Sequence, residues 1–384
     1  MPSLVELRKR YLSGLSSDQT AGIEYYTALL EAIAGRSPAG SPLLQHLIQL
    51  LRTKGSALSV TDIRRITRSL GESPALDAYI FDLFKDRPDL SGHITEFMYG
   101  GKDSLDDRRC AAWCRFMLEH GYRLEHERAV GILIEKNSLP GEIKVLQLAL
   151  SARYAGKGDP RTVRTAGSCI DRLIGEPQTG SALGIEAAKI LHDNSLRLTK
   201  HTADELRRFV RKVEDSTGSP IEEPIKTYRS FHEQLPFLRS KGLLIVQFLF
   251  YGDPDHSGSG ASGGLGTIVR DLGTALSELP GITGVITVTI YDTAEAKYSY
   301  DPVGFAGERH AILRMPFYLG NAGSERFIQL RGEILKEAGW ITRVLIEYGP
   351  DVSPLYHVRY LDSAALACCR AAKQAGVPAV MTLT

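Results

Sequence analysis

The chain has 384 residues, more than one ordinary domain, and its 43% hydrophobic and 24% charged residues are typical of a globular protein. A net charge of +1 provides no field that would attract nucleic acid or an anionic membrane. The longest apolar run, 243–250, is too short to cross a bilayer, and the N-terminus lacks the basic-then-apolar order of a signal peptide. We therefore expect a cytoplasmic protein of two domains with no membrane span and no nucleic-acid partner.

Residues 1–235 repeat the apolar pattern of amphipathic helices, with stripes such as Ile23, Tyr26, Leu30 and Ile33. Glycine and proline interrupt these stripes at 35–40, 71–74 and 156–160. Paired helices with short loops predict a HEAT-like or armadillo-like repeat, although an irregular bundle is also possible because no clear repeat period exists. This half has no convergent cluster of His, Asp, Glu or Cys, so we expect it to pack, to bind a protein partner or to regulate, and to do no chemistry itself.

The chain contains five cysteines, Cys110, Cys114, Cys169, Cys368 and Cys369. Their odd number and the absence of a C-x-x-C pair argue against a disulfide framework and against a zinc site. Cys110 and Cys114 are one helical turn apart beside Trp113, so we expect them in a hydrophobic core. We expect neither a metal ion nor a cofactor.

A polar, proline-interrupted segment, 214–224, marks a predicted boundary, and a helical segment, 225–239, follows it. From Gly242 onward strand and helix patterns alternate. The predicted strands are 243–250, 285–291, 311–314 and 377–384, with a short strand end at His357, and the predicted helices are 265–279, 327–339 and 364–376. This alternation predicts a doubly wound, Rossmann-like α/β domain over residues 241–384.

A glycine-rich loop, 251–266, lies between the first strand and its helix. Ligands of open parallel sheets bind beyond the carboxyl ends of the strands, where such a loop lies. Glycines let the backbone approach a ligand, and helix N-termini favour anions. The loop lacks the G-K-[S/T] ending of a Walker A motif, and it does not combine G-x-G-x-x-G with an acidic residue closing the second strand. A flexible surface turn is the alternative interpretation.

Four segments of residues 241–384 resemble one group of enzymes. Residues 262–276, beginning Ser-Gly-Gly-Leu-Gly-Thr, resemble the G-G-L-G-D-V loop and helix of glycogen and starch synthases and the T-G-G-Q helix of sucrose and sucrose-phosphate synthases. Residues 311–317 are similar to the I-I-R-I-P-F strand of sucrose-phosphate synthases, and 357–362 to their H-x-H-Y-x-D segment. Residues 371–384, which contain Ala-Gly-Val-Pro-Ala-Val-Met-Thr-Leu-Thr, resemble their G-V-P-x-V-x-T strand, whereas residues 1–235 share no such motif.

The resemblance implies a retaining GT-B glycosyltransferase, in which two Rossmann-like domains face each other and residues 241–384 form the acceptor-side domain. Its ligands would be a nucleotide sugar and a sugar or small-molecule acceptor. By the same resemblance, Gly263, Gly264 and Gly266 would offer backbone N–H groups to the donor phosphates. The residues that would line the acceptor pocket are His357, Arg359, Tyr360 and Asp362.

The sequence departs from these families at several positions. Ala261 replaces the lysine of glycogen synthases, and Leu265 replaces the glutamine of sucrose-phosphate synthases. Arg359 replaces the second histidine, and an arginine there would suit a phosphate or carboxylate on the acceptor or would face solvent. The family's catalytic histidine and second domain are expected beyond Thr384, so we expect residues 1–384 alone to be a fragment without turnover.

Two other functions fit the sequence less well. One is a non-catalytic helical scaffold that carries a degenerate glycosyltransferase domain, and a second Rossmann-like half would distinguish it from the enzyme. The other is a different Rossmann-like enzyme, such as an epimerase or a dinucleotide-dependent reductase. No acidic residue closes the predicted strand 285–291, with Asp292 the nearest, and this disfavours the second alternative.

Overall fold

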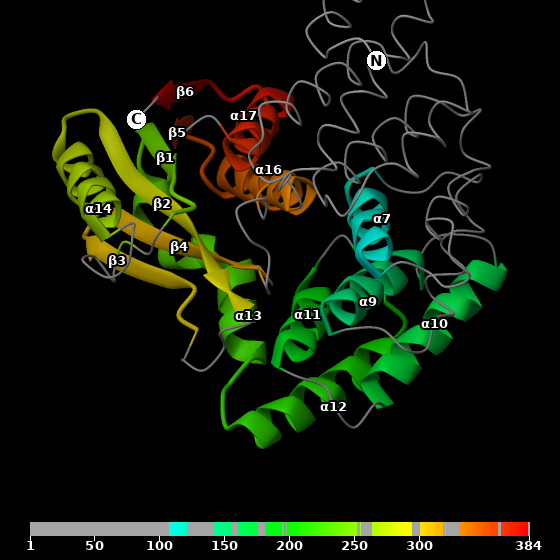
Figure 1. Cartoon of the computed structure of the whole chain (residues 1–384). Helices are drawn as coiled ribbons and strands as arrows, with labels where there is room; N and C mark the ends of the chain where they lie inside the picture. The colour runs from blue at the N-terminus through cyan, green and yellow to red at the C-terminus, as the bar shows by residue number, and fades with distance from the viewer. Residues whose placement is uncertain are drawn as a thin grey trace, which may run out of the picture. The chain divides into compact units, whose positions relative to one another are not determined.

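A computed structural model of the chain, shown in Figure 1, describes most of residues 141–382 and one earlier helix. The described residues are 107–120, 141–155, 160–175, 181–193, 196, 198–251, 254, 263–293, 300–317, 319, 327, 330–359 and 362–382. The chain divides into two compact units between Leu133 and Ile134. The helices predicted before residue 107 lie outside the described residues.

In the first unit the described residues form α7, Asp107–His120. Cys110, Cys114 and Trp113 are buried there, as predicted from their spacing. The ring of Trp113 stacks on that of Phe116, with 5.1 Å between the centroids and 18° between the planes. The buried residues of α7 are therefore mostly apolar, and the charged Arg109 is buried among them.

The second unit begins with helices. They are α9 (Gly141–Ala155), α10 (Pro160–Gly175), α11 (Ser181–His192), α12 (Lys200–Thr217) and α13 (Glu222–Arg229). The Thr199 hydroxyl caps α12 by accepting from the Thr202 N–H group, and α12 ends at Gly218, whose φ of +67° is in the left-handed region. These helices lie in the same compact unit as the sheet that follows.

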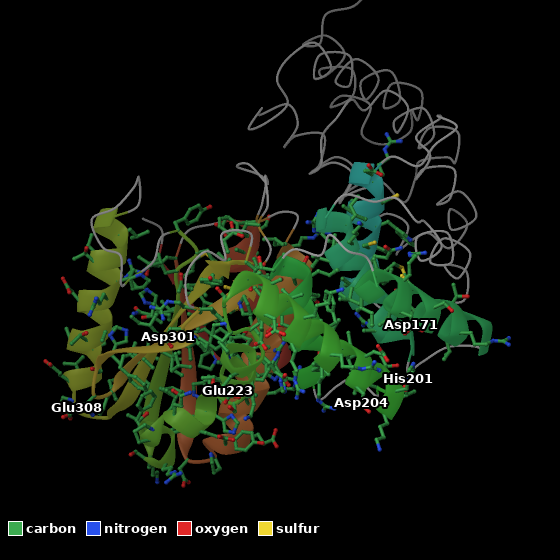
Figure 2. All side chains as sticks on the ribbon, turned by 90° about the horizontal axis from the view of Figure 1, so that it is seen from below. Asp171, His201, Asp204, Glu223, Asp301 and Glu308 are labelled. Carbon is green, nitrogen blue, oxygen red and sulfur yellow. The ribbon has the colours of Figure 1, made fainter. Side chains whose placement is uncertain are left out.

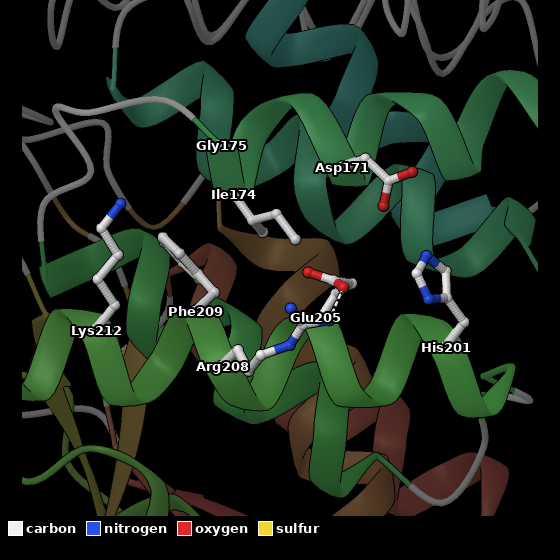
Figure 3. Close-up of a pocket in the computed structure, with 8 residues that line it drawn as sticks. All are labelled: Asp171, Ile174, Gly175, His201, Glu205, Arg208, Phe209 and Lys212. Atoms are coloured by element: carbon white, nitrogen blue, oxygen red, sulfur yellow. Dashed lines mark hydrogen bonds and ion pairs between the residues drawn. The ribbon is translucent and has the colours of Figure 1, made fainter.

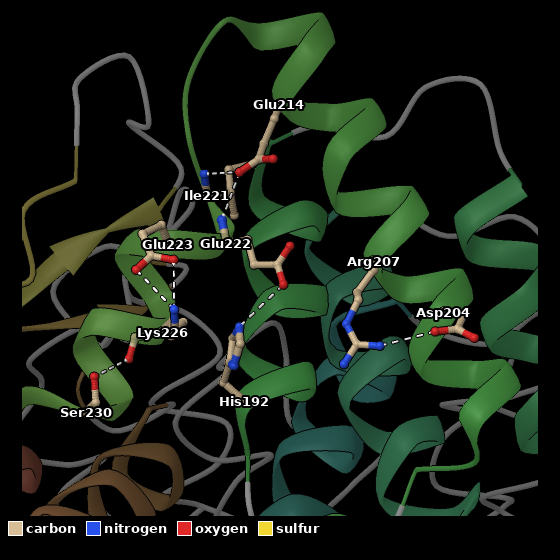
Figure 4. Close-up of polar contacts among 9 residues, drawn as sticks. All are labelled: His192, Asp204, Arg207, Glu214, Ile221, Glu222, Glu223, Lys226 and Ser230. Carbon is tan, nitrogen blue, oxygen red and sulfur yellow. Dashed lines mark hydrogen bonds and ion pairs between the residues drawn. The ribbon is translucent and has the colours of Figure 1, made fainter.

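Residues 214–224, predicted as a boundary, comprise the last turn of α12, a connection of residues 218–221 and the start of α13 (Figure 4). Glu214 Oε1 accepts hydrogen bonds from the backbone N–H groups of Ile221 at 2.6 Å and Glu222 at 2.9 Å. One carboxylate of α12 thus satisfies two N–H groups at the start of α13. His192 Nε2 lies 3.8 Å from Glu222 Oε1, which links the end of α11 to the same turn.

The sheet has six strands in the order β3-β4-β2-β1-β5-β6. Their bounds are β1 Gly242–Phe248, β2 Ile282–Asp292, β3 Val303–Gly307, β4 His310–Phe317, β5 Val352–Arg359 and β6 Ala379–Thr382. All neighbours pair in parallel except β3, which is antiparallel to β4. Asp301 and Glu308 flank β3 (Figure 2). The predicted α/β class is confirmed, whereas β3 was not predicted and makes the sheet mixed.

Helices cover both faces of this sheet (Figure 1). On one face lies α14, Gly263–Glu278, where Gln247 Nε2 of β1 donates to the Val269 carbonyl at 3.0 Å. On the other lie α16, Arg331–Tyr348, and α17, Ser363–Gln374. There the Tyr356 hydroxyl of β5 donates to the Ala338 carbonyl at 3.3 Å. Side chains of a strand alternate between the two faces. Gln247 of β1 therefore lies on the α14 face, and Tyr356 of β5 lies on the face covered by α16 and α17.

Candidate ligand site at the carboxyl edge of the sheet

The connections that leave β1 and β5 diverge. From β1 the chain passes through α14 to β2, whereas β5 lies on the other side of β1 and its connection, α17, leads outward to β6. Such a point, where the strand order reverses, opens a crevice at the carboxyl ends of the two central strands. The glycine-rich segment follows β1, and residues 357–359 end β5, so the fold brings the starts of both predicted motifs to this edge.

The three predicted glycines form the first turn of α14. The helix begins at Gly263, two residues before the predicted start at Leu265. Gly264 is exposed, and a Cβ placed on it would meet no atom within 4 Å. Gly266 is buried. The N–H groups of a first helical turn have no partner within the helix, so this turn can donate hydrogen bonds to an anion.

His357 and Arg359 point toward the α14 face of the sheet. Tyr356 contacts α16, its neighbours along the strand point the other way, and His357 pairs in register with Gln247. His357 Nε2 and the Thr382 hydroxyl of β6 lie 2.8 Å apart. Burial, and then the Arg359 guanidinium, lower the pKa of His357, so this imidazole is mostly neutral at pH 7. Arg359 is 7% exposed.

Asp362 lies on the opposite face, and both of its carboxylate oxygens accept hydrogen bonds. Oδ1 accepts from the Ala365 N–H group at 2.7 Å and thereby caps α17. Oδ2 accepts from the Tyr251 hydroxyl at 2.9 Å. The fold therefore separates Asp362 from His357 and Arg359, although the sequence grouped them in one pocket. The fourth member of that group, Tyr360, lies outside the described residues.

Tyr251 belongs to the loop predicted to lie at this edge, but no contact was predicted for its side chain. Its ring meets that of Phe327 edge-to-face, with 4.9 Å between the centroids and 80° between the planes. The only signal in the sequence was its position at the start of the glycine-rich loop, which does not specify a partner more than 100 residues later.

The second strand ends in an acidic residue, contrary to the prediction. Its hydrogen-bonded ladder with β4 continues to Asp292, one residue beyond the predicted end at Tyr291. Asp292 Oδ1 accepts a hydrogen bond from the Leu319 N–H group at 3.1 Å, which ties the end of β2 to the chain after β4. The predicted end was wrong because Asp292 pairs in the ladder despite the low strand propensity of aspartate.

A separate pocket of about 350 Å³ lies between α10 and α12 (Figure 3). Ile174 and Phe209 provide its apolar lining, and the polar residues around it are Asp171, His201, Glu205, Arg208 and Lys212. Acidic and basic side chains both contribute, and Arg208 pairs with Glu205. None of the residues predicted to bind a ligand lines this pocket.

Within the described ranges, no three His, Cys, Asp or Glu side chains gather where they could hold a metal ion. No helix among the described residues is long and apolar enough to span a membrane. Comparisons with protein-family models, with curated proteins and with solved structures gave no match.

Proposed function

We propose that residues 241–384 are the acceptor-side half of a retaining nucleotide-sugar glycosyltransferase. One observation carries the proposal: a buried parallel strand, β1, leads through a glycine-rich segment into the N-terminus of α14, at the edge where the strand order reverses. The motif resemblance over 262–276, 311–317, 357–362 and 371–384 supplies the reaction class. A fold of this kind serves many chemistries, so the motifs and the site together support the proposal.

The hydrogen-bond donors and the positive charge at this edge of the sheet suit the phosphates and hydroxyl groups of a nucleotide sugar and its acceptor. The first turn of α14 would donate N–H groups to the donor phosphates, where negative charge develops as the sugar leaves. Arg359 would bind a phosphate or carboxylate with its planar guanidinium group. His357, mostly neutral, has a ring nitrogen that can hydrogen-bond a sugar hydroxyl. The catalytic group would come from outside these residues.

Gly264→Asp tests the phosphate role. The new side chain would enter open space, and a carboxylate at a helix N-terminus stabilises the helix, so the fold should not suffer. The same carboxylate would repel a diphosphate. We expect UDP-glucose and ADP-glucose, tested by saturation-transfer NMR and calorimetry, to bind wild type and to bind Gly264→Asp at least about tenfold more weakly. Gly264→Asn is the neutral control of equal shape and should retain more affinity.

Failure of wild type to bind any nucleotide sugar would contradict the proposal and favour the non-catalytic scaffold. Equal binding by the aspartate and asparagine variants would show that no phosphate lies at this turn.

One observation favours a dinucleotide enzyme as a second candidate. Asp292 closes β2, and Gly258, Gly260 and Gly263 have the G-x-G-x-x-G spacing. Against it, residues 249–257 separate β1 from the first of these glycines, whereas the dinucleotide motif makes a tight turn there. The Asp292 carboxylate also already accepts from Leu319. We expect NAD and NADP not to bind in a fluorescence titration.

A further inference from the structure

We infer that Tyr251 and Asp362 are positioning residues, which form a clasp across the switch point and hold the chain that leaves β1 against the start of α17, next to the ligand site that we propose. The inference rests on the proposed function, because it concerns the same edge of the sheet. It assigns to Asp362 a different task from the acceptor contact that the motif resemblance implies.

The clasp continues the link between β1 and β5 beyond their backbone ladder. That ladder ends with the pair Phe248 and Val358. Past this pair the two chains diverge, one toward α14 and the other toward α17. The hydrogen bond of 2.9 Å from Tyr251 to Asp362 joins them again beyond the end of the ladder.

Each partner of the clasp is itself held in place. Asp362 is fixed by its cap on α17, where it accepts from Ala365 at 2.7 Å. The Tyr251 ring is fixed by its edge-to-face contact with Phe327. The hydroxyl and the carboxylate are therefore preorganised for their hydrogen bond. A hydrogen bond to a carboxylate is also stronger than one between two neutral groups.

Because both oxygens of Asp362 are engaged, a ligand hydroxyl could reach this carboxylate only by displacing Tyr251 or adding to an occupied acceptor. His357 and Arg359 face the other side of the sheet. The clasp thus occupies the α17 side of this edge, and we expect the ligand on the α14 side, where His357 and Arg359 lie.

Tyr251→Phe tests the clasp, since it keeps the ring beside Phe327 and removes only the hydroxyl. The structure offers a matched control in Tyr228→Phe, whose hydroxyl donates to the Glu337 carboxylate at the same distance, 2.9 Å, but in the contact between α13 and α16. We expect Tyr251→Phe to weaken nucleotide-sugar binding about tenfold, and Tyr228→Phe to lower the melting temperature without changing that affinity.

A second readout does not depend on the ligand. The amides of Ala365 and Leu366 bond to Asp362, so their hydrogen exchange reports the first turn of α17. We expect exchange at these two amides to accelerate about tenfold in Tyr251→Phe and to remain at the wild-type rate in Tyr228→Phe. Asp362→Asn, which keeps a capping oxygen, should weaken binding similarly, and the double variant no further.

The two readouts separate the clasp from the proposed function. If wild type binds no nucleotide sugar, the proposed function fails, and the exchange rates alone decide whether the clasp exists. Unchanged exchange in Tyr251→Phe would overturn the clasp. Accelerated exchange with unchanged affinity for a ligand that does bind would overturn its positioning role.

Discussion

The guanidinium group of Arg229 makes two hydrogen bonds to the carboxylate of Glu337, a residue 108 positions later, at 2.8 and 3.0 Å. Both side chains are almost fully buried, at 10% and 6% exposure. The Tyr228 hydroxyl donates to the same carboxylate at 2.9 Å, and the guanidinium carbon lies 4.5 Å from the centroid of the Trp340 ring. This cluster joins α13, the last α-helix before β1, to α16, which packs on the sheet.

Removing the charge of Glu337 should be costly. In Glu337→Gln the buried Arg229 guanidinium loses its counter-charge, and breaking a buried pair in this way costs about 3–5 kcal/mol. Urea unfolding followed by circular dichroism measures the change. Glu223→Gln is the control, because its pair with Lys226 is exposed and such pairs contribute about 0–1 kcal/mol. Equal losses of unfolding free energy in the two variants would show that the buried pair of Arg229 and Glu337 stabilises the fold no more than an exposed pair does.

The same pair predicts how stability depends on pH. Burial alone would raise the pKa of Glu337, but Arg229 and Lys189 together lower it from 4.5 to about 2. A carboxyl whose pKa is lower in the folded state stabilises the fold above its unfolded pKa, so this contribution is lost as pH falls from about 4.5 through about 2.

The stabilisation lost when Glu337 is protonated should be of the order of 3 kcal/mol. Between about pH 4.5 and pH 2, the free energy of unfolding should therefore fall more steeply for wild type than for Glu337→Gln. Parallel curves for the two proteins would contradict the assignment, because the other carboxyl groups titrate equally in both.

Gly273 is a position where α14 approaches the sheet closely. A Cβ there would lie 2.4 Å from His310 Cε1 and 2.5 Å from Gln247 Nε2. These side chains belong to a buried polar network, in which Gln247 donates to Thr287 at 2.6 Å and Thr287 lies 2.8 Å from His310 Nε2. Gly273→Ala should therefore destabilise the fold by about 1–3 kcal/mol through overpacking.

Gly167 in α10 provides the matched control, since a Cβ there would meet nothing within 4 Å. Gly167→Ala should stabilise by about 0.5–1 kcal/mol, the ordinary helix preference for alanine. Thermal unfolding of both variants measures the difference. A stabilised Gly273→Ala would show that α14 can move away from the sheet at little cost.

Arg359→Lys tests whether the guanidinium shape matters at the end of β5. Lysine retains the charge but loses the planar pair of donors that fits a phosphate or carboxylate, so we expect nucleotide-sugar or acceptor affinity to fall about tenfold. Arg370→Lys, at an exposed position of α17, is the control and should bind like wild type. Equal affinities in calorimetric titrations would place Arg359 outside the ligand site.

The strand and helix alternation after Gly242 was predictable because β1 is a nearly continuous apolar run, as buried parallel strands are. β2 is rich in the β-branched residues that favour strands. β3 escaped prediction because five residues with two glycines, Val303–Gly307, carry no clear strand pattern. The cap at Asp362 had a readable signal, an aspartate directly before a helix. The bond from Tyr251 to Asp362 and that from Arg229 to Glu337 had none, because each joins residues that only the folded chain brings together.

The topology also sets an order of assembly. β3 and β4 pair across a turn of two residues, Glu308 and Arg309, so their contact closes a very short loop. β1 and β5 pair Gly242 with Val352, and closing so long a loop carries a larger entropic cost. Contacts of this separation slow folding. The ligand site that we propose between β1 and β5 is therefore among the last features that the folding chain completes. A nascent chain that ends before β5 cannot form this site.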